Sequence, residues 1–206
     1  MLFIVLLILL FIVILPAANN AKAHKSGAIG ERSVSVALRN IGFEVFDNVM
    51  FVMNGRTVQI DHLAVSQKGV LVVETKNHHG VINGNAYEKE WHQWLNCEDY
   101  PFYNPVWQNY GHVKTVQSLF ALPKDKVKGI VIFSSDPVLN LIEGGNLITT
   151  LLNLPNCLEK FPRDIMTPKE VERISLLIRA ANISDKELAK EHIKQVEETK
   201  KEKKCA

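Results

Sequence analysis

The sequence predicts an α/β domain, a sheet flanked by helices, with an apolar helix before it and a helical extension after it. A stretch with apolar residues at helical spacing comes first, and three strand-like runs joined by short turns follow it. Further predicted helices come after these strands. The 206 residues, 47% hydrophobic and 22% charged, suffice for one packed domain with additions and exclude general disorder. We expect a membrane anchor at 1–18, a linker at 19–25, the domain at 26–140 and the extension at 141–206.

The N-terminal segment predicts a membrane helix, because residues 1–15 contain no polar side chain. Residues 1–18 would measure about 27 Å as a helix, just under the thickness of the hydrocarbon layer. The nearest cations, Lys22, Lys25 and Arg32, all follow this run, so the positive-inside rule places the domain in the cytoplasm. A cleaved signal peptide, here without its basic n-region, and a buried core helix remain alternatives.

Net charge and cysteines exclude several classes of protein. A formal net charge of +2 is too small to argue nucleic-acid binding from overall electrostatics, so any phosphate contact must be local. The three cysteines at positions 97, 157 and 205 are scattered and odd in number. Neither a zinc site nor a disulfide framework follows from that spacing, and ordinary reduced thiols are expected.

The first element of the domain is a predicted helix. Val34, Leu38 and Ile41 recur at helical spacing, and Gly42 provides a stop. Glu31 lies on the same apolar face, which must look toward the sheet. Its carboxylate has an alternative explanation, a favourable interaction with the dipole of the first helical turn.

Three strands should follow as an antiparallel meander, because short turn sequences separate them. The predicted strands are Glu44–Met53, Thr57–Val65 and Gly69–Lys76. The turns are Asn54-Gly55 and residues 67–69, and residues 81–84 suggest a further hairpin.

The later elements are marked by their caps. Asn104-Pro105 predicts a helix start, with Asn as N-cap and Pro at the first position, and the helix should run to about Leu119. Residues 128–134 predict a short buried strand, and residues 146–162 are ambiguous. Residues 167–170 form a capping box for a helix to about Ala181, and residues 184–187 form a second one that opens a charged helix.

Charged residues beside two of these strands indicate chemistry. Glu74 and Lys76, two apart in a strand, project from the same face, and Asp61 can approach Glu74 from the neighbouring strand. Two close carboxylates need a cation, and Mg²⁺ suits them because it also binds water and phosphate oxygens. A lysine beside the metal would hold or deprotonate the attacking water, as phosphodiester hydrolysis requires. The alternative is a salt bridge at a strand end; Glu-Thr-Lys recurs at 198–200 in the charged tail.

Five motifs together resemble the nuclease-related domain family, NERD, within the PD-(D/E)XK nuclease superfamily. They span roughly residues 26–120 in order: GAIGE at 27–31, QIDHLAVS at 59–66, GVLVVETKNHHG at 69–80, Trp91 with Trp94, and NPVWQ at 104–108. The resemblance implies a restriction-endonuclease-like fold, a mixed central sheet flanked by helices.

The same resemblance assigns roles to single residues. It implies Asp61, Glu74 and Lys76 as the catalytic trio, with Mg²⁺ or Mn²⁺ held by Asp61 and Glu74. It further implies that Glu31 supports the metal from the first helix and that Gln108 positions Lys76 or a phosphate. His112 stands where some relatives have Tyr in a Gln-x3-Tyr element.

Other polar and aromatic residues near this site have simpler interpretations. We expect His62, His78 and His79 to be turn and surface histidines, because hard Mg²⁺ prefers oxygen ligands. Trp91 and Trp94 could stack on bases, although aromatic residues near a small core usually pack within it.

The sequence therefore favours a membrane-anchored, metal-dependent nuclease that hydrolyses phosphodiester bonds of nucleic acid, with DNA as the expected substrate. The alternative is a catalytically silent module of the same fold that binds nucleic acid or serves as a scaffold. A third hypothesis, a membrane-associated protein whose charged tail recruits a partner, rests on the KKEKK run at 200–204, and such runs are usually solvated helix ends.

Overall fold

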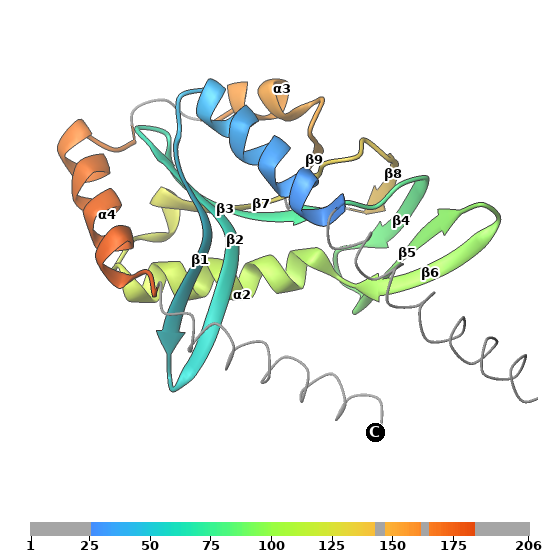
Figure 1. Ribbon diagram of the computed structural model, residues 1–206, viewed down its shortest axis with the longest axis horizontal. Coiled ribbons are helices and arrows are strands. Elements are labelled where there is room, and N and C mark those ends of the chain that lie inside the picture. The colour runs from blue at the N-terminus through green and yellow to red at the C-terminus, as the bar shows by residue number, and fades with distance from the viewer. Residues whose placement is uncertain (1–25, 143–146, 162–164, 184–206) are drawn as a thin grey trace, which may run out of the picture.

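The computed structural model describes residues 26–142, 147–161 and 165–183 (Figure 1). The predicted anchor, the second capping box and the charged tail lie outside these residues. Among the residues described, no helix combines the length and the apolar character needed to cross a bilayer.

Two sheets form the framework of the molecule. The larger has the strand order β1-β2-β3-β7-β9, and the smaller has the order β6-β5-β4-β8. Their strands are β1 (Glu44–Met53), β2 (Arg56–Ser66), β3 (Gly69–Lys76), β4 (Val81–Asn85), β5 (Glu90–Leu95), β6 (Glu98–Tyr103), β7 (Val127–Phe133), β8 (Val138–Ile142) and β9 (Leu147–Thr150). The expectation of a mixed α/β fold is confirmed, with two mixed sheets in place of one.

The larger sheet combines the expected meander with parallel additions. Strands β1, β2 and β3 pair antiparallel, as their short turns predict. Strand β7 then pairs parallel to β3, and β9 pairs parallel to β7. Because β3 lies at the centre of this sheet, its buried residues are almost continuously apolar up to Glu74.

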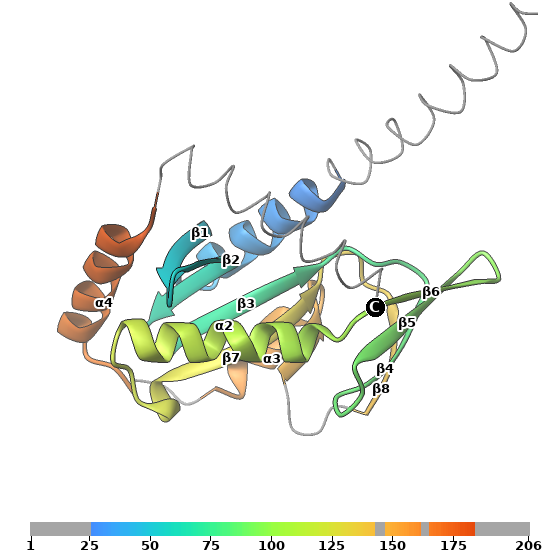
Figure 2. The ribbon, with the colours of Figure 1, turned by 90° about the horizontal axis from the view of Figure 1, so that it is seen from below.

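Helices cover both faces of the larger sheet (Figures 1 and 2). The first helix, residues 26–40, and α3 (Leu154–Glu159) lie on one face, whereas α2 (Pro105–Leu119) crosses the other. A 3-10 turn, η1 (Lys124–Lys126), leads from α2 to β7. Helix α4 (Pro168–Ala181) packs against β2 at one end of the sheet.

The caps predicted from the sequence are present. The Asn104 side chain accepts hydrogen bonds from the backbone amides of Val106 and Trp107, and its amide group donates to the carbonyl of Glu88 at 2.6 Å. Asn104 therefore both starts α2 and fastens it to the β4–β5 turn. Thr167 and Glu170 form the expected capping box of α4.

Two hydrophobic layers follow from the alternation of side chains along β3. Val70 and Val72 join the cluster that holds α2 and α4 to the sheet. Leu71 and Val73 face the opposite side, where they pack against the first helix and α3. Glu74 and Lys76 continue the even-numbered series, so they emerge on the α2 face.

The smaller sheet corrects one prediction. Residues 81–84 lie inside β4, and the turn of the hairpin falls between Asn85 and Glu90. Gly84 is required within the strand because the buried Trp91 indole lies against it. A Cβ there would come within 2.4 Å of the ring.

The ambiguous stretch from 146 to 162 contains β9 and α3 among its described residues. Strand β9 extends the larger sheet beyond β7, and β8 joins the smaller sheet beside β4. The part of the chain after residue 140 thus contributes a strand to the central sheet as well as helices.

Candidate functional site

The charged residues of the two motifs meet where β3 leaves the sheet. The antiparallel register pairs His62 with Val73, so the next step along both strands sets Asp61 beside Glu74. Both carboxylates face α2, on the side of the sheet to which Val72 also points. The expected approach of Asp61 to Glu74 is therefore present.

Glu74 and Lys76 form a buried ion pair beneath α2. The Lys76 ammonium donates to Glu74 Oε1 at 2.7 Å and to Gln108 Oε1 at 3.1 Å. The Glu74 side chain is only 3% exposed, so the contact is shielded from solvent. Gln108 thereby holds Lys76, one of the two partners that the family resemblance implies for it, and Lys76 supplies part of the compensation for the Glu74 charge.

The second oxygen of Glu74 lacks a hydrogen-bond donor among the described residues. His112 Nε2 lies 3.6 Å from this oxygen, which is longer than a hydrogen bond. Burial alone would raise the pKa of Glu74, but His112 and the Lys76 ammonium outweigh it and hold the pKa below its usual value. Glu74 is thus an anion with one oxygen open to a further partner.

The pKa of Asp61 is shifted in the opposite direction from that of Glu74. Its Oδ2 accepts a hydrogen bond from the Thr75 backbone amide at 2.8 Å. Burial, and next the negative charge of Glu74, raise the pKa of Asp61 to about 7, and Glu31 adds to the increase. Asp61 therefore has more negative charge around it than its hydrogen bond compensates.

Glu31 reaches this site from the first helix. Gly30 lets that helix approach the ends of β3 and β7, since a Cβ there would lie 2.3 Å from Ser134 Oγ. Val34 and Leu38 bury the same helix face against the sheet. The structure thus brings Glu31 near enough to affect Asp61 electrostatically, although the two make no direct hydrogen bond among the described residues.

The donor set fits a hard divalent cation. Asp61 and Glu74 offer two carboxylates on one face, and one Glu74 oxygen has no hydrogen-bond partner within the described part of the chain. Within the described ranges, no three His, Cys, Asp or Glu side chains lie close enough to hold a metal alone. Mg²⁺ accepts one or two carboxylates and completes its shell with water and substrate phosphate, so two suffice.

Of the three motif histidines, His79 is exposed in the loop after β3, as predicted, whereas His62 and His78 are placed differently. His62 is 1% exposed, and its Nδ1 lies 2.8 Å from Asp47 Oδ1 on the neighbouring strand, so it is a core histidine and not a surface one. His78 is partly buried, hydrogen-bonded to Gln93 and stacked on Phe102 with ring centroids 4.3 Å apart. Both act as structural supports around the site.

The two tryptophans for which the sequence left base stacking and core packing open differ in their exposure. Trp91 is fully buried and packs in the cluster that joins the sheets, as core aromatics usually do. Trp94 is 46% exposed on the same strand.

A lysine, two carboxylates and a glutamine thus gather at the end of a central strand of this α/β protein. The nuclease-related domain family, NERD, matches residues 26–134, more than half of the chain. The chain belongs to this family.

Two similar proteins extend the comparison. An uncharacterized protein of Bacillus anthracis is 31% identical over 196 residues, which cover 91% of this chain and 92% of that protein. A crystal structure of a protein of unknown function covers 80% of this chain and 93% of its own, at 15% identity and a TM-score of 0.39. That likeness is too low to support an argument.

Proposed function

We propose that this chain is a divalent-metal-dependent nuclease that hydrolyses phosphodiester bonds of DNA. One observation carries the proposal: Lys76 is fixed between Glu74 and Gln108, beside a second, partly buried carboxylate, Asp61. A salt bridge for stability alone would not need a second carboxylate whose charge opposes the first. Membership of the nuclease-related domain family supports the same conclusion.

Each side chain has a role that its contacts suggest. Asp61 and Glu74 would hold Mg²⁺ or Mn²⁺, with Glu31 adding negative charge from the first helix. The ion, when bound, would supply Lewis-acid activation of the phosphate and of a water.

Lys76 has the geometry of a group that orients water and stabilises charge on the phosphate. Two of its three N–H donors are used by Glu74 and Gln108, the partners found among the described residues. The third can reach a water or a non-bridging phosphate oxygen. In the reaction, the water oxygen would bond to phosphorus as the bond to the leaving sugar oxygen breaks.

The proposal also includes the cellular arrangement expected from the sequence. Residues 1–18 would anchor the chain in the membrane, and residues 26–140 would form the nuclease domain on the cytoplasmic side. The support is the apolar run itself and the cations that follow it. Residues 141–206 would be an extension that completes the central sheet and ends in a charged tail.

The function is tested by incubating the detergent-solubilised full chain with fluorescently labelled DNA and RNA in Mg²⁺, Mn²⁺ or EDTA. We expect cleavage of DNA with either metal and none in EDTA. Cleavage that persists in EDTA would contradict the metal requirement. Binding without cleavage under all conditions would identify a silent nucleic-acid-binding module instead.

A further inference from the structure

A row of exposed aromatic side chains runs along α2 and the strand that leads into it. Trp107 and Tyr110 are three apart and Lys114 follows four later, so the three share one face of the helix. Tyr103, at the end of β6, lies beside Trp107 with ring centroids 6.4 Å apart. Tyr103, Trp107 and Tyr110 are 47%, 41% and 61% exposed, more than packing in a core would leave.

This row is held in place by specific contacts. The Trp107 indole donates to the carbonyl of Ala86 at 2.9 Å, which fixes the ring against the β4–β5 turn. The Lys114 ammonium lies 5.2 Å from the Tyr110 ring centroid. Flat exposed rings that are pre-oriented lose little entropy when a planar ligand stacks on them.

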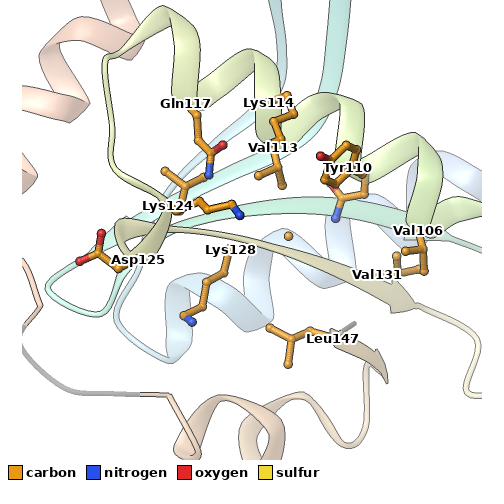
Figure 3. Close-up of a pocket in the computed structure, with 13 residues that line it drawn as sticks. Val106, Tyr110, Val113, Lys114, Gln117, Lys124, Asp125, Lys128, Val131 and Leu147 are labelled. Carbon is orange, nitrogen blue, oxygen red and sulfur yellow. The ribbon is translucent and has the colours of Figure 1, made fainter. Parts of the chain in front are cut away.

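Beside this row lies a groove between α2 and β7, with a volume of about 710 Å³ (Figure 3). Tyr110 and Lys114 form part of its α2 wall, and Lys124 and Lys128 contribute from η1 and β7. Among the lining residues that the structure describes, the one carboxylate belongs to Asp125. Three ammonium groups against one carboxylate leave the groove positively charged.

The three lysines form no ion pair with a carboxylate among the described residues, in contrast to Lys126, which pairs with Glu170 at 2.5 Å. Lys128 instead lies 5.8 Å from the Phe161 ring centroid. Their charge is therefore available to an anionic ligand, although the chain as a whole carries a net charge of only +2.

The row and the groove lie close to the catalytic residues in the chain. Gln108, which holds Lys76, directly follows Trp107, and turns its side chain to the other flank of α2. A strand resting on Tyr110 is thus separated from the Lys76 site by the width of one helix.

We propose that Tyr103, Trp107 and Tyr110, with the lysines of the groove, form a binding track for single-stranded nucleic acid. Stacked aromatic rings beside a cationic groove suit a single strand, because its unpaired bases can stack while its phosphates contact the lysines. A duplex keeps its bases inside and offers the rings nothing to stack on. The proposal rests on the proposed function, since it names the form in which the substrate binds.

Binding is tested in EDTA, where no metal-dependent cleavage occurs, with the detergent-solubilised full chain. Fluorescence anisotropy of an oligothymidylate of about 15 nucleotides, the upper range of such site sizes, reports affinity, and a duplex of equal length is compared. We expect the single strand to bind more tightly. Tyr110→Ala should weaken its binding about tenfold, the effect of losing one stacked base, whereas Tyr110→Phe should keep it.

The lysines are tested by the salt dependence of the same binding. Lys124→Ala combined with Lys128→Ala should reduce the slope of log affinity against log salt by about 1.4, since each single-strand phosphate contact contributes about 0.7. Lys169→Ala, an exposed lysine on α4, is the control and should leave the slope unchanged.

The outcomes separate this inference from the nuclease proposal. Equal binding by wild type and Tyr110→Ala, an unchanged salt slope, or a preference for the duplex would overturn the track, whether or not the protein cleaves. The expected binding pattern in a protein that never cleaves would uphold the track and reject the nuclease.

Discussion

At the scale of single residues, the site is a set of charges that compensate one another incompletely. Lys76 balances Glu74, whereas the burial of Asp61 and its carboxylate neighbours outweigh the Thr75 amide and the Lys76 charge, which favour its ionised form. The incompletely compensated charge of Asp61 should therefore lower the free energy of unfolding of the protein. This decrease can be measured in the metal-free protein.

Asp61→Asn should stabilise the metal-free protein above neutral pH. The pKa of Asp61 is raised from 3.8 to about 7, so the folded state keeps a proton that the unfolded state releases between these values. Stability of the wild type should then fall as pH rises from about 4 to 7, and the variant should lack this decline, with a gain on the order of 1–3 kcal/mol at pH 8. Denaturant unfolding in EDTA at a series of pH values measures the free energy of unfolding. The same pH dependence of this free energy in wild type and variant would refute the prediction.

At the same scale, the charged residues of the motifs were predictable, whereas the buried position of His62 was not. Asp61, Glu74 and Lys76 follow from strand alternation, because one face of a strand repeats every second residue. His62 was misplaced because it was judged as a possible metal ligand, although it lies within the predicted strand Thr57–Val65. The register that sets it directly opposite Asp47 becomes visible only when β1 and β2 are paired.

At the scale of elements, the first helix and α2 carry the site residues to the sheet. Gly30 allows the first helix to come close to Ser134 at the end of β7, and Gln108 projects from α2 toward Lys76. Strands β1 and β3 and helix α2 begin and end as predicted, because their turns and caps are encoded locally. The Asn83-Gly84 pair looked like a turn, and only the packing of Trp91 explains why Gly84 lies in a strand.

Gly30→Ala should destabilise the protein by about 1 kcal/mol or more, because the new methyl group must displace Ser134. Ser134 Oγ would lose its contacts with the carbonyl of Lys76 and with Asn77. Gly27→Ala is the matched control in the same helix, where a Cβ meets nothing within 4 Å. It should be neutral or stabilising by up to about 1 kcal/mol through helix propensity. Thermal unfolding of both variants measures the difference in stability. Equal melting temperatures would contradict the close approach of Gly30 to Ser134.

At the scale of the whole molecule, the larger sheet is joined to the smaller sheet through a shared core. Ile82 and Trp91 of the smaller sheet pack against Val131 and Phe133 of β7. The second sheet and β9 were not predicted, since strands of four to six residues are too short to show a clear periodicity, and β8 pairs with β4 from far along the chain. The meander was predictable because its partners are adjacent in sequence.

The N-terminal run yields a prediction at this scale. Residues 1–18 should stay attached and hold the protein in the membrane, since the run is long enough to span with little tilt. Mass spectrometry of the mature protein should find the segment intact, and protease added to intact cells should spare the domain. A mature N-terminus near His24 would indicate export, and digestion from outside would reverse the orientation.

The most direct test of the central claim is the rate of metal-dependent DNA cleavage by wild type and by Lys76→Ala. Lys76 lies at the end of β3, so its removal should leave the fold and circular dichroism spectrum unchanged while lowering the rate at least about 100-fold. Lys200→Ala, which alters the second Glu-Thr-Lys tripeptide, should cleave like wild type. Equal rates for wild type and Lys76→Ala would show that the Asp61, Glu74 and Lys76 site does not carry out the reaction.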